Sequence, residues 1–286
     1  MKRWMSLSHL SVIELSPPEA VSVAHAAGFD CVDLRLAKAV PSDTEYPVFG
    51  QTPMLRETLA RLRDTGVRVF DIELIRLKRD TDPGSFERLF DTAQRLGARR
   101  IKVAGDDKDL AVITERFAQV CAMAARYGLQ VDLEFMPWSG VSSVASAVGV
   151  VTAAAQPNGQ VLIDALHLSR SGGHPSDLAA FDRRAFGYLQ LCDAPAMLPP
   201  DLDAILHEAR TERLIPGDGG LPLLELLAVF PADTPVSIEL PMKALAARLP
   251  ALERARLFAR GTRDLLARAS ARASARAASL PKESAT

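Results

Sequence analysis

A helix–glycine–strand unit recurs along the first half of the chain and constrains its fold more than any other feature. Each copy has an amphipathic stretch, a Gly, two or three further residues and an apolar β-rich run: AAGFDCVDLRL (26–36), DTGVRVFDIELIRL (64–77), RLGARRIKVAGD (95–106) and RYGLQVDLEFMP (126–137). The last three glycines are spaced 31 residues apart, which is the size of one βα step. Because Gly commonly follows the last turn of a helix, the pattern predicts alternating helices and strands.

Four more candidate strands complete a set of eight. They are MSLSHLS (5–11), NGQVLIDALHL (158–168), FGYLQLCDAP (186–195) and VSIELP (236–241), with amphipathic segments between them. The strands are near-continuous apolar runs, as expected of parallel strands covered on both faces. Eight βα units in 286 residues predict a single (β/α)8 TIM barrel of the α/β class. A doubly wound sheet is the alternative, but SHLSVIELSPPE lacks its Gly-rich phosphate turn.

The predicted barrel domain spans residues 1–267, and residues 268–286 form a tail of different composition. The tail repeats Ala, Ser and Arg and ends in polar residues. Such a segment is typical of a frayed helix end or a disordered terminus. We assign it no function.

Composition and charge argue against several classes of protein. The chain has 34 basic and 35 acidic residues and a net charge of −1, so we expect no nucleic-acid partner. Three distant cysteines without a CxxC pair argue against a thiolate zinc site or a disulfide framework and fit a reducing cytoplasm. No apolar run reaches the ~18 residues of a membrane span, and the N-terminus lacks the apolar core of a signal peptide. We therefore expect a cytoplasmic protein that does not bind membranes.

Oxygen-bearing side chains end each of the last four predicted strands. In a (β/α)8 barrel, active-site residues lie at the C-terminal ends of the strands. The four side chains are Glu134, Asp164, Gln190 and Glu239, and His167 follows three residues after Asp164. One Glu at a strand end is often only a salt-bridge partner or a helix cap. Four such residues in register on adjacent strands are harder to explain in that way.

A divalent cation would resolve the electrostatic conflict among these carboxylates. Three carboxylates in one mouth raise one another's pKa values, and a cation removes the repulsion. Four oxygen ligands without a cysteine favour Mn²⁺, Mg²⁺ or Co²⁺ over Zn²⁺. The sequence therefore predicts one divalent metal ion held by Glu134, Asp164, Gln190 and Glu239.

Basic and polar residues on the same predicted rim are candidates for substrate binding. Arg210 and Arg213 precede a PGDGG turn, and Arg suits bidentate recognition of carboxylate or phosphate. The alternative is an ordinary charged helix end followed by a turn. Arg35, Glu73 and Lys102, on the second, third and fourth strands, face the same rim if the strand assignments hold.

The order of these motifs resembles a known superfamily. LEFMP, LIDALHL, YLQLCDAP, RLIPGDGGL and SIELP resemble the xylose isomerase-like TIM barrels, also described as sugar phosphate isomerases/epimerases or the AP endonuclease family 2 fold. The resemblance extends over about residues 5–265. It implies that the four oxygen ligands named above bind the metal, and that His167 and Arg213, with Arg210 next, contact the substrate.

The resemblance also implies a reaction. In a sugar or sugar-phosphate isomerase or epimerase, Glu134 and Glu239 would exchange a proton beside the carbonyl of a small polyhydroxy keto substrate through a metal-stabilised enediolate. One position departs from this pattern, because ketose epimerases of the family normally have His where this chain has Gln190. Gln at this position is more similar to the 3-dehydroshikimate dehydratases. A lyase with His167 as the acid/base is therefore the alternative.

Other functions are disfavoured by the same residues. An endonuclease of this fold needs a multi-histidine zinc site, but the chain has five histidines and only His167 lies in the constellation. A non-catalytic small-molecule binder remains the alternative from another class, although it would not need the four metal ligands. Homodimers and homotetramers are common among such barrels, so either assembly is compatible with the chain.

Overall fold

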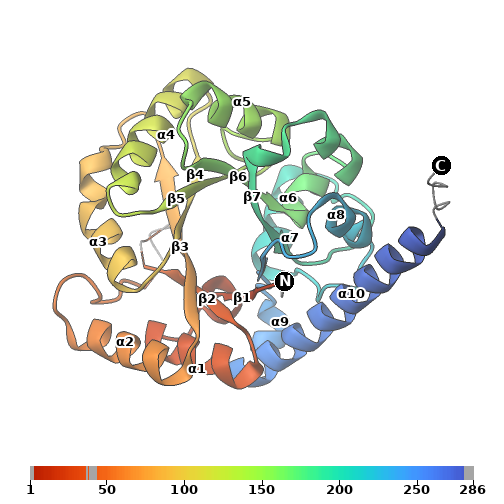
Figure 1. Cartoon of the computed structure of the whole chain (residues 1–286), viewed down its shortest axis with the longest axis horizontal. Helices are drawn as coiled ribbons and strands as arrows, with labels where there is room; N and C mark the ends of the chain where they lie inside the picture. Colours follow the sequence, from red (N-terminus) through yellow and green to blue (C-terminus); the bar gives the residue numbers. More distant parts are fainter. Residues whose placement is uncertain (1–2, 37, 39–43, 280–286) are drawn as a thin grey trace, which may run out of the picture.

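The structure is a closed parallel barrel. It is a computed structural model that describes residues 3–36, 38 and 44–279. The described strands pair in parallel in the order β1 to β8, and β1 pairs with β8 to close the ring. Figure 1 shows this ring with the helices outside it. The predicted single (β/α)8 barrel is thereby confirmed. The strands are β1 (Met5–Ser8), β2 (Cys31–Arg35), β3 (Arg68–Leu77), β4 (Arg100–Gly105), β5 (Gln130–Glu134), β6 (Gly159–Asp164), β7 (Phe186–Leu191) and β8 (Val236–Ile238).

The helices cover the outer face of the barrel, and several are capped as their sequences suggest. Thr52 accepts a hydrogen bond from the backbone N–H of Leu55 at the start of α2. Gly28 and Gly66 follow α1 and α2 with φ of 78° and 74°, which explains the glycine of the repeating unit. The helices are α1 (Pro17–Ala27), α2 (Pro53–Thr65), α3 (Glu87–Arg95), α4 (Leu110–Ala125), α5 (Val144–Ala154), α6 (Ala165–Arg170), α7 (Leu202–Thr211), α8 (Leu223–Val229), α9 (Lys243–Ala246) and α10 (Ala251–Ser279).

Several predicted strands end earlier in the structure. The first was expected over 5–11, but β1 ends at Ser8 and a 3-10 helix runs from His9 to Val12. The Ser8 side chain accepts a hydrogen bond from the backbone N–H of Leu10 at 3.3 Å, which favours the turn over a longer strand. The eighth strand was expected over 236–241, but β8 ends at Ile238. Glu239 therefore lies one residue beyond the end of β8, and its backbone N–H donates to the Leu191 carbonyl of β7 at 3.2 Å.

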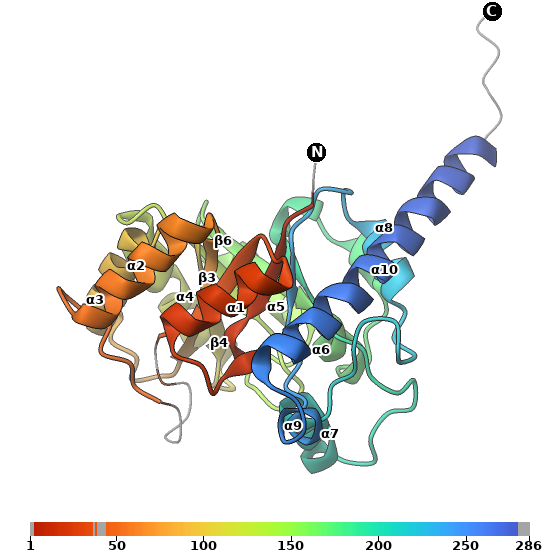
Figure 2. The same ribbon diagram turned by 90° about the horizontal axis from the view of Figure 1, so that it is seen from below.

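The C-terminal helix runs past the predicted end of the barrel domain. α10 continues to Ser279, and Figure 2 shows its last turns extending beyond the barrel. Residues 280–286 of the predicted tail lie outside the described residues, and the domain boundary at residue 267 stays a prediction. Across the described chain, we find no helix that combines the length and the apolar character needed to cross a membrane.

Two buried acids lie inside the barrel. Asp33 accepts hydrogen bonds from the hydroxyls of Ser6 and Ser237, and Asp71 accepts one from Tyr188. Burial raises the pKa of Asp33 to about 7, and the nearby Glu73 carboxylate adds to the rise. Burial also raises the pKa of Asp71 well above its usual range. The folded barrel therefore binds protons that an unfolded chain releases near pH 4.

We predict that Asp33→Asn weakens the dependence of stability on pH. Because the folded pKa of Asp33 is raised from 3.8 to about 7, its contribution to the free energy of unfolding is fully present below pH 4 and is lost as the pH rises through 7. The wild type should therefore lose more stability than Asp33→Asn between about pH 4 and about pH 8. Urea unfolding at several pH values measures this difference. Parallel curves for the two proteins would contradict the role given to Asp33.

Candidate functional site

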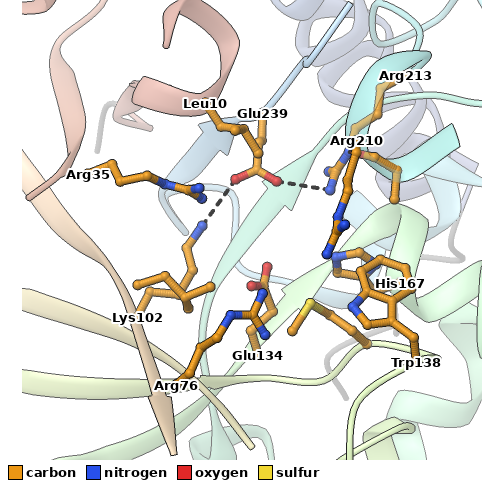
Figure 3. A pocket seen from close by; sticks show the side chains of 13 residues that line it. Leu10, Arg35, Arg76, Lys102, Glu134, Trp138, His167, Arg210, Arg213 and Glu239 are labelled. Atoms are coloured by element: carbon orange, nitrogen blue, oxygen red, sulfur yellow. Dashed lines mark hydrogen bonds and ion pairs between the residues drawn. The ribbon is translucent and has the colours of Figure 1, made fainter. Parts of the chain in front are cut away.

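One pocket lies at the C-terminal mouth of the barrel, where most of the predicted site residues meet. It has a volume of about 260 Å³, which suits a small molecule. Figure 3 shows its side chains converging from several strands and from α7. The predicted residues that line it are Arg35, Lys102, Glu134, His167, Arg210, Arg213 and Glu239. The other predicted residues, Glu73, Asp164 and Gln190, are buried and contact these lining residues.

Three side chains of the mouth form a compact group of potential metal ligands. Glu134, Asp164 and His167 each offer one ligand atom, and these atoms lie within 4.8 Å of one another. Glu134 Oε1 and His167 Nδ1 are buried and have no hydrogen-bond partner among the described residues. A buried polar atom without a partner is costly, so a cation or a substrate group is its expected partner. The donor set fits a divalent ion. A second group of this kind, made by Asp33, Asp71 and Glu73, is fully buried.

The other two predicted ligands are joined to a buried lysine. Gln190 donates from Nε2 to Glu239 Oε1 at 2.8 Å. The Lys102 ammonium lies 3.2 Å from the same Glu239 oxygen and 3.3 Å from Gln190 Oε1. Glu239 belongs to neither compact group of described acids and histidines. Burial acts to raise the pKa of Glu239, but Lys102 and Arg213 outweigh it and lower this pKa. Glu239 is therefore ionised at neutral pH.

Arg213 bridges two of the predicted metal ligands. Its side chain is 2% exposed. Nη1 donates to Asp164 Oδ2 at 2.7 Å, and Nη2 lies 2.9 Å from Glu239 Oε2. Nε donates to the backbone carbonyl of Ala209 at 2.9 Å. Figure 3 shows the guanidinium beside Glu239. Arg213 was predicted to touch substrate, and these contacts add a second role, which is to fix the two carboxylates.

Glu134 and His167 have strongly shifted pKa values. Burial raises the pKa of Glu134 to about 8; Lys102 opposes the rise, while Glu239 and Asp164 add to it. Burial lowers the pKa of His167 to about 4, against the attraction of Asp164. The His167 ring is therefore neutral near pH 7. It packs edge-on against Trp138, with ring centroids 5.1 Å apart.

The remaining predicted residues divide between paired and unpaired side chains. Arg35 Nη2 lies 3.3 Å from Glu73 Oε2, and Lys102 Nζ lies 3.8 Å from the same oxygen. The Ser8 hydroxyl donates to the other Glu73 oxygen at 2.8 Å. Glu73 is therefore an internal counter-ion. Arg210, in contrast, forms no hydrogen bond or ion pair with the described residues, and Figure 3 shows it pointing into the pocket.

The pocket also contains a cation that sequence reasoning missed and an apolar wall. Arg76 on β3 lines the pocket and donates from Nη1 to both carboxylate oxygens of Asp106, at 3.0 and 3.1 Å. Its position near the end of β3 was the signal that could have found it. Leu74, Met136 and Trp138 also line the pocket and pack together. The pocket thus combines an apolar wall with several cations.

The turn that follows Arg213 is held by a buried acid. Asp193 Oδ1 accepts backbone N–H bonds from Ala194 and Leu221, and its Oδ2 accepts one from Gly217. A Cβ at Gly219 would lie 2.4 Å from the Ala194 carbonyl oxygen, so the PGDGG turn requires glycine at this close approach. This clamp fixes the segment that carries Arg213.

A match to a protein-family model shows to which family the barrel belongs. The model of the xylose isomerase-like TIM barrel matches residues 21–262. The chain belongs to this family. The resemblance seen in the sequence motifs is thereby confirmed. No curated protein matches the chain.

Solved structures with the same fold are distant in sequence. A xylose isomerase-like TIM barrel/4-hydroxyphenylpyruvate dioxygenase fusion protein superposes with a TM-score of 0.80 at 21% identity over 99% of this chain and 46% of that one. This chain thus spans less than half of the fusion protein. The IOLI protein, with a bound zinc atom, gives 0.79 at 16% identity over 93% of this chain and 98% of that one. A probable 3-DHS dehydratase involved in petrobactin synthesis, from Bacillus anthracis, gives 0.71 at 18% identity over 91% and 98%.

We predict that Arg213→Met makes the stability of the fold depend on a divalent ion. The substitution leaves the buried Asp164 and Glu239 carboxylates without their shared cation. Breaking a buried ion pair costs about 3–5 kcal/mol. Mn²⁺ should restore part of this loss, because it supplies positive charge to the same carboxylates. Thermal unfolding in EDTA and in Mn²⁺ measures the ion-dependent gain. Arg210→Met is the control, because Arg210 has no described partner. Equal gains for the two variants would contradict the bridging role of Arg213.

Proposed function

We propose that this chain is a divalent-metal-dependent lyase that dehydrates a carboxylate-bearing hydroxyketone of the 3-dehydroshikimate type. The observation that carries the proposal is the buried, unpartnered Glu134 oxygen beside Asp164 and His167 at the mouth of the barrel. Glu134 and Asp164 would hold the ion, with Gln190 and Glu239 as the predicted further ligands. When bound, the ion supplies Lewis-acid stabilisation of an enolate.

The charges of the pocket support an anionic substrate. Five cations line it: Arg35, Arg76, Lys102, Arg210 and Arg213. Described carboxylates pair with four of these cations, and Arg210 is the exception. Arg210 has no partner among the described residues and can bind a carboxylate in bidentate fashion. The wall of Leu74, Met136 and Trp138 suits the face of a carbon ring. A neutral ketose would leave Arg210 without an anionic partner.

The residues of the site divide the work of dehydration. His167 is neutral because burial lowers its pKa to about 4, and its free Nδ1 can accept the proton from the carbon beside the carbonyl. Breaking this C–H bond forms the enolate. The enolate then expels the β-hydroxyl, and His167 returns the proton so that water leaves. Lys102 and Arg213 keep Glu239 ionised and fixed throughout.

A second candidate uses the same residues without loss of water. In an isomerase or epimerase, Glu134 and Glu239 would remove and return a proton on opposite faces of a ketose or sugar phosphate. The cations of the pocket favour a phosphorylated ketose over a neutral one in this case. The family's epimerases normally have a histidine at the position of Gln190. Here Gln190 is hydrogen-bonded to Glu239 and Lys102. The glutamine at this position favours the lyase.

We predict that Glu134→Gln abolishes turnover without unfolding the protein. The amide keeps the shape of the side chain but cannot supply the anionic oxygen, so kcat should fall by a factor of about 10² or more. The ultraviolet absorbance of the aromatic product measures dehydration of 3-dehydroshikimate by wild type and variant. Solvent-deuterium incorporation into ketoses and ketose phosphates tests the second candidate in parallel.

Three outcomes distinguish the lyase from the epimerase and test the site assignment. Dehydration by the wild type and its loss in Glu134→Gln support the lyase. Deuterium exchange into a ketose phosphate without dehydration would replace the lyase by the epimerase. Near wild-type activity of Glu134→Gln on a verified substrate would contradict the site assignment in both.

A further inference from the structure

Two arginine ion pairs cross-link α6 and α7 beside the pocket. At the start of α6, Asp164 receives the guanidinium of Arg213, which lies just after α7. At the end of α6, Arg170 reaches in the opposite direction to Glu208 within α7. The first pair belongs to the site already described. The second pair lies outside the pocket, and the proposed reaction does not use it.

The Arg170–Glu208 pair is fully built. Arg170 Nε donates to Glu208 Oε2 at 2.7 Å, and Nη2 donates to Glu208 Oε1 at 2.8 Å. Nη2 also donates to the backbone carbonyl of Pro195 at 2.7 Å, and Nη1 donates to the Ser169 hydroxyl at 3.1 Å. The two side chains are 0% and 10% exposed. Such a bidentate, buried fork fixes both distance and orientation.

The pair holds the helix that presents Arg210 to the pocket. Glu208 precedes Ala209, whose carbonyl accepts from Arg213, and Arg210, which points into the pocket. α7 has only ten residues, and on this turn Glu208 and Ala209 are buried whereas Arg210 is exposed. Rotation of this turn would move Arg210 out of the pocket. Arg170 opposes that rotation from the neighbouring helix.

We propose that Arg170 and Glu208 are positioning residues that set the place of Arg210 for the anionic group of the substrate. The inference rests on the proposed function, because it assumes that Arg210 binds a carboxylate. Arg170 contacts neither the substrate pocket nor the carboxylates of Glu134 and Glu239. It acts through α7. The consequence is a change of affinity for the anion rather than of the chemical step.

The test uses a double-mutant cycle with Arg210. Removing both charges together, in Arg170→Met/Glu208→Leu, leaves no buried unpaired charge and so preserves folding. We expect KM for 3-dehydroshikimate to rise about tenfold with kcat nearly unchanged, as for Arg210→Ala. In the Arg210→Ala background, Arg170→Met/Glu208→Leu should cause no further rise in KM, because the Arg210 guanidinium that the ion pair positions is absent. Arg170→Lys, which keeps the charge but not the fork, should give an intermediate rise.

A binding measurement keeps the inference independent of turnover. Calorimetric titration with 3,4-dihydroxybenzoate, the dehydration product, should show the same pattern in Kd across the cycle. The matched control is Arg184→Met, which breaks an exposed ion pair with Asp182 and should change neither KM nor Kd. Circular dichroism checks that each variant is folded.

The outcomes distinguish the two proposals. Failure of the wild type to dehydrate the substrate, together with tight and Arg170-dependent probe binding, contradicts the proposed reaction and supports the positioning role. Additive effects of the Arg170 pair and Arg210→Ala overturn the positioning role, as does an unchanged Kd in Arg170→Met/Glu208→Leu. A wild type that does not bind the carboxylate probe overturns it too, because Arg210 would then have no anion to hold.

Discussion

Neutralising carboxylates that the barrel buries in its mouth is the constraint on which the site depends. Glu134, Asp164 and Glu239 are at most 4% exposed, and an isolated buried charge is too costly to retain. Arg213 and Lys102 neutralise Asp164 and Glu239, but Oε1 of Glu134 has no partner in the described chain. We therefore assign a divalent ion to Glu134, which among these three acids is the one whose pKa is raised.

The closed barrel makes this arrangement possible because it brings distant parts of the sequence to one edge. Lys102 and Glu239 are separated by 137 positions, yet their side chains meet at 3.2 Å. Parallel strands all end at the same rim, so the inward-facing side chains near their ends face a common centre. The short helix α6 and the turn clamped by Asp193 then place His167 and Arg213.

Much of the fold followed from local patterns, and less of the site did. The recurring glycine after each helix predicted the βα unit, because a left-handed residue is a local requirement that Gly28 and Gly66 meet. Strand ends located Glu134, Asp164, Gln190 and Glu239. Boundaries were less predictable, since the Ser8 side chain ends β1 through a cap that competes with the strand.

The ion-pair partners of the site residues could not be predicted from the sequence. No spacing indicates that Arg213 joins Asp164 to Glu239, or that Arg170 reaches Glu208, because both contacts depend on the packing of α7. Arg76 was not predicted as a pocket residue, because its position depends on which face of β3 turns inward. The buried acids Asp33 and Asp71 looked like ordinary strand residues, and only the closed barrel shows that they share its interior with hydroxyl donors.

The most direct measurement of the central claim is the anomalous diffraction of a crystal soaked in Mn²⁺. We predict one strong peak in the mouth, about 2.0–2.3 Å from oxygens of Glu134 and Asp164, and its disappearance in Glu134→Gln crystals of unchanged fold. A peak elsewhere, or none at a saturating concentration of the ion, would contradict the claim that a divalent cation neutralises Glu134.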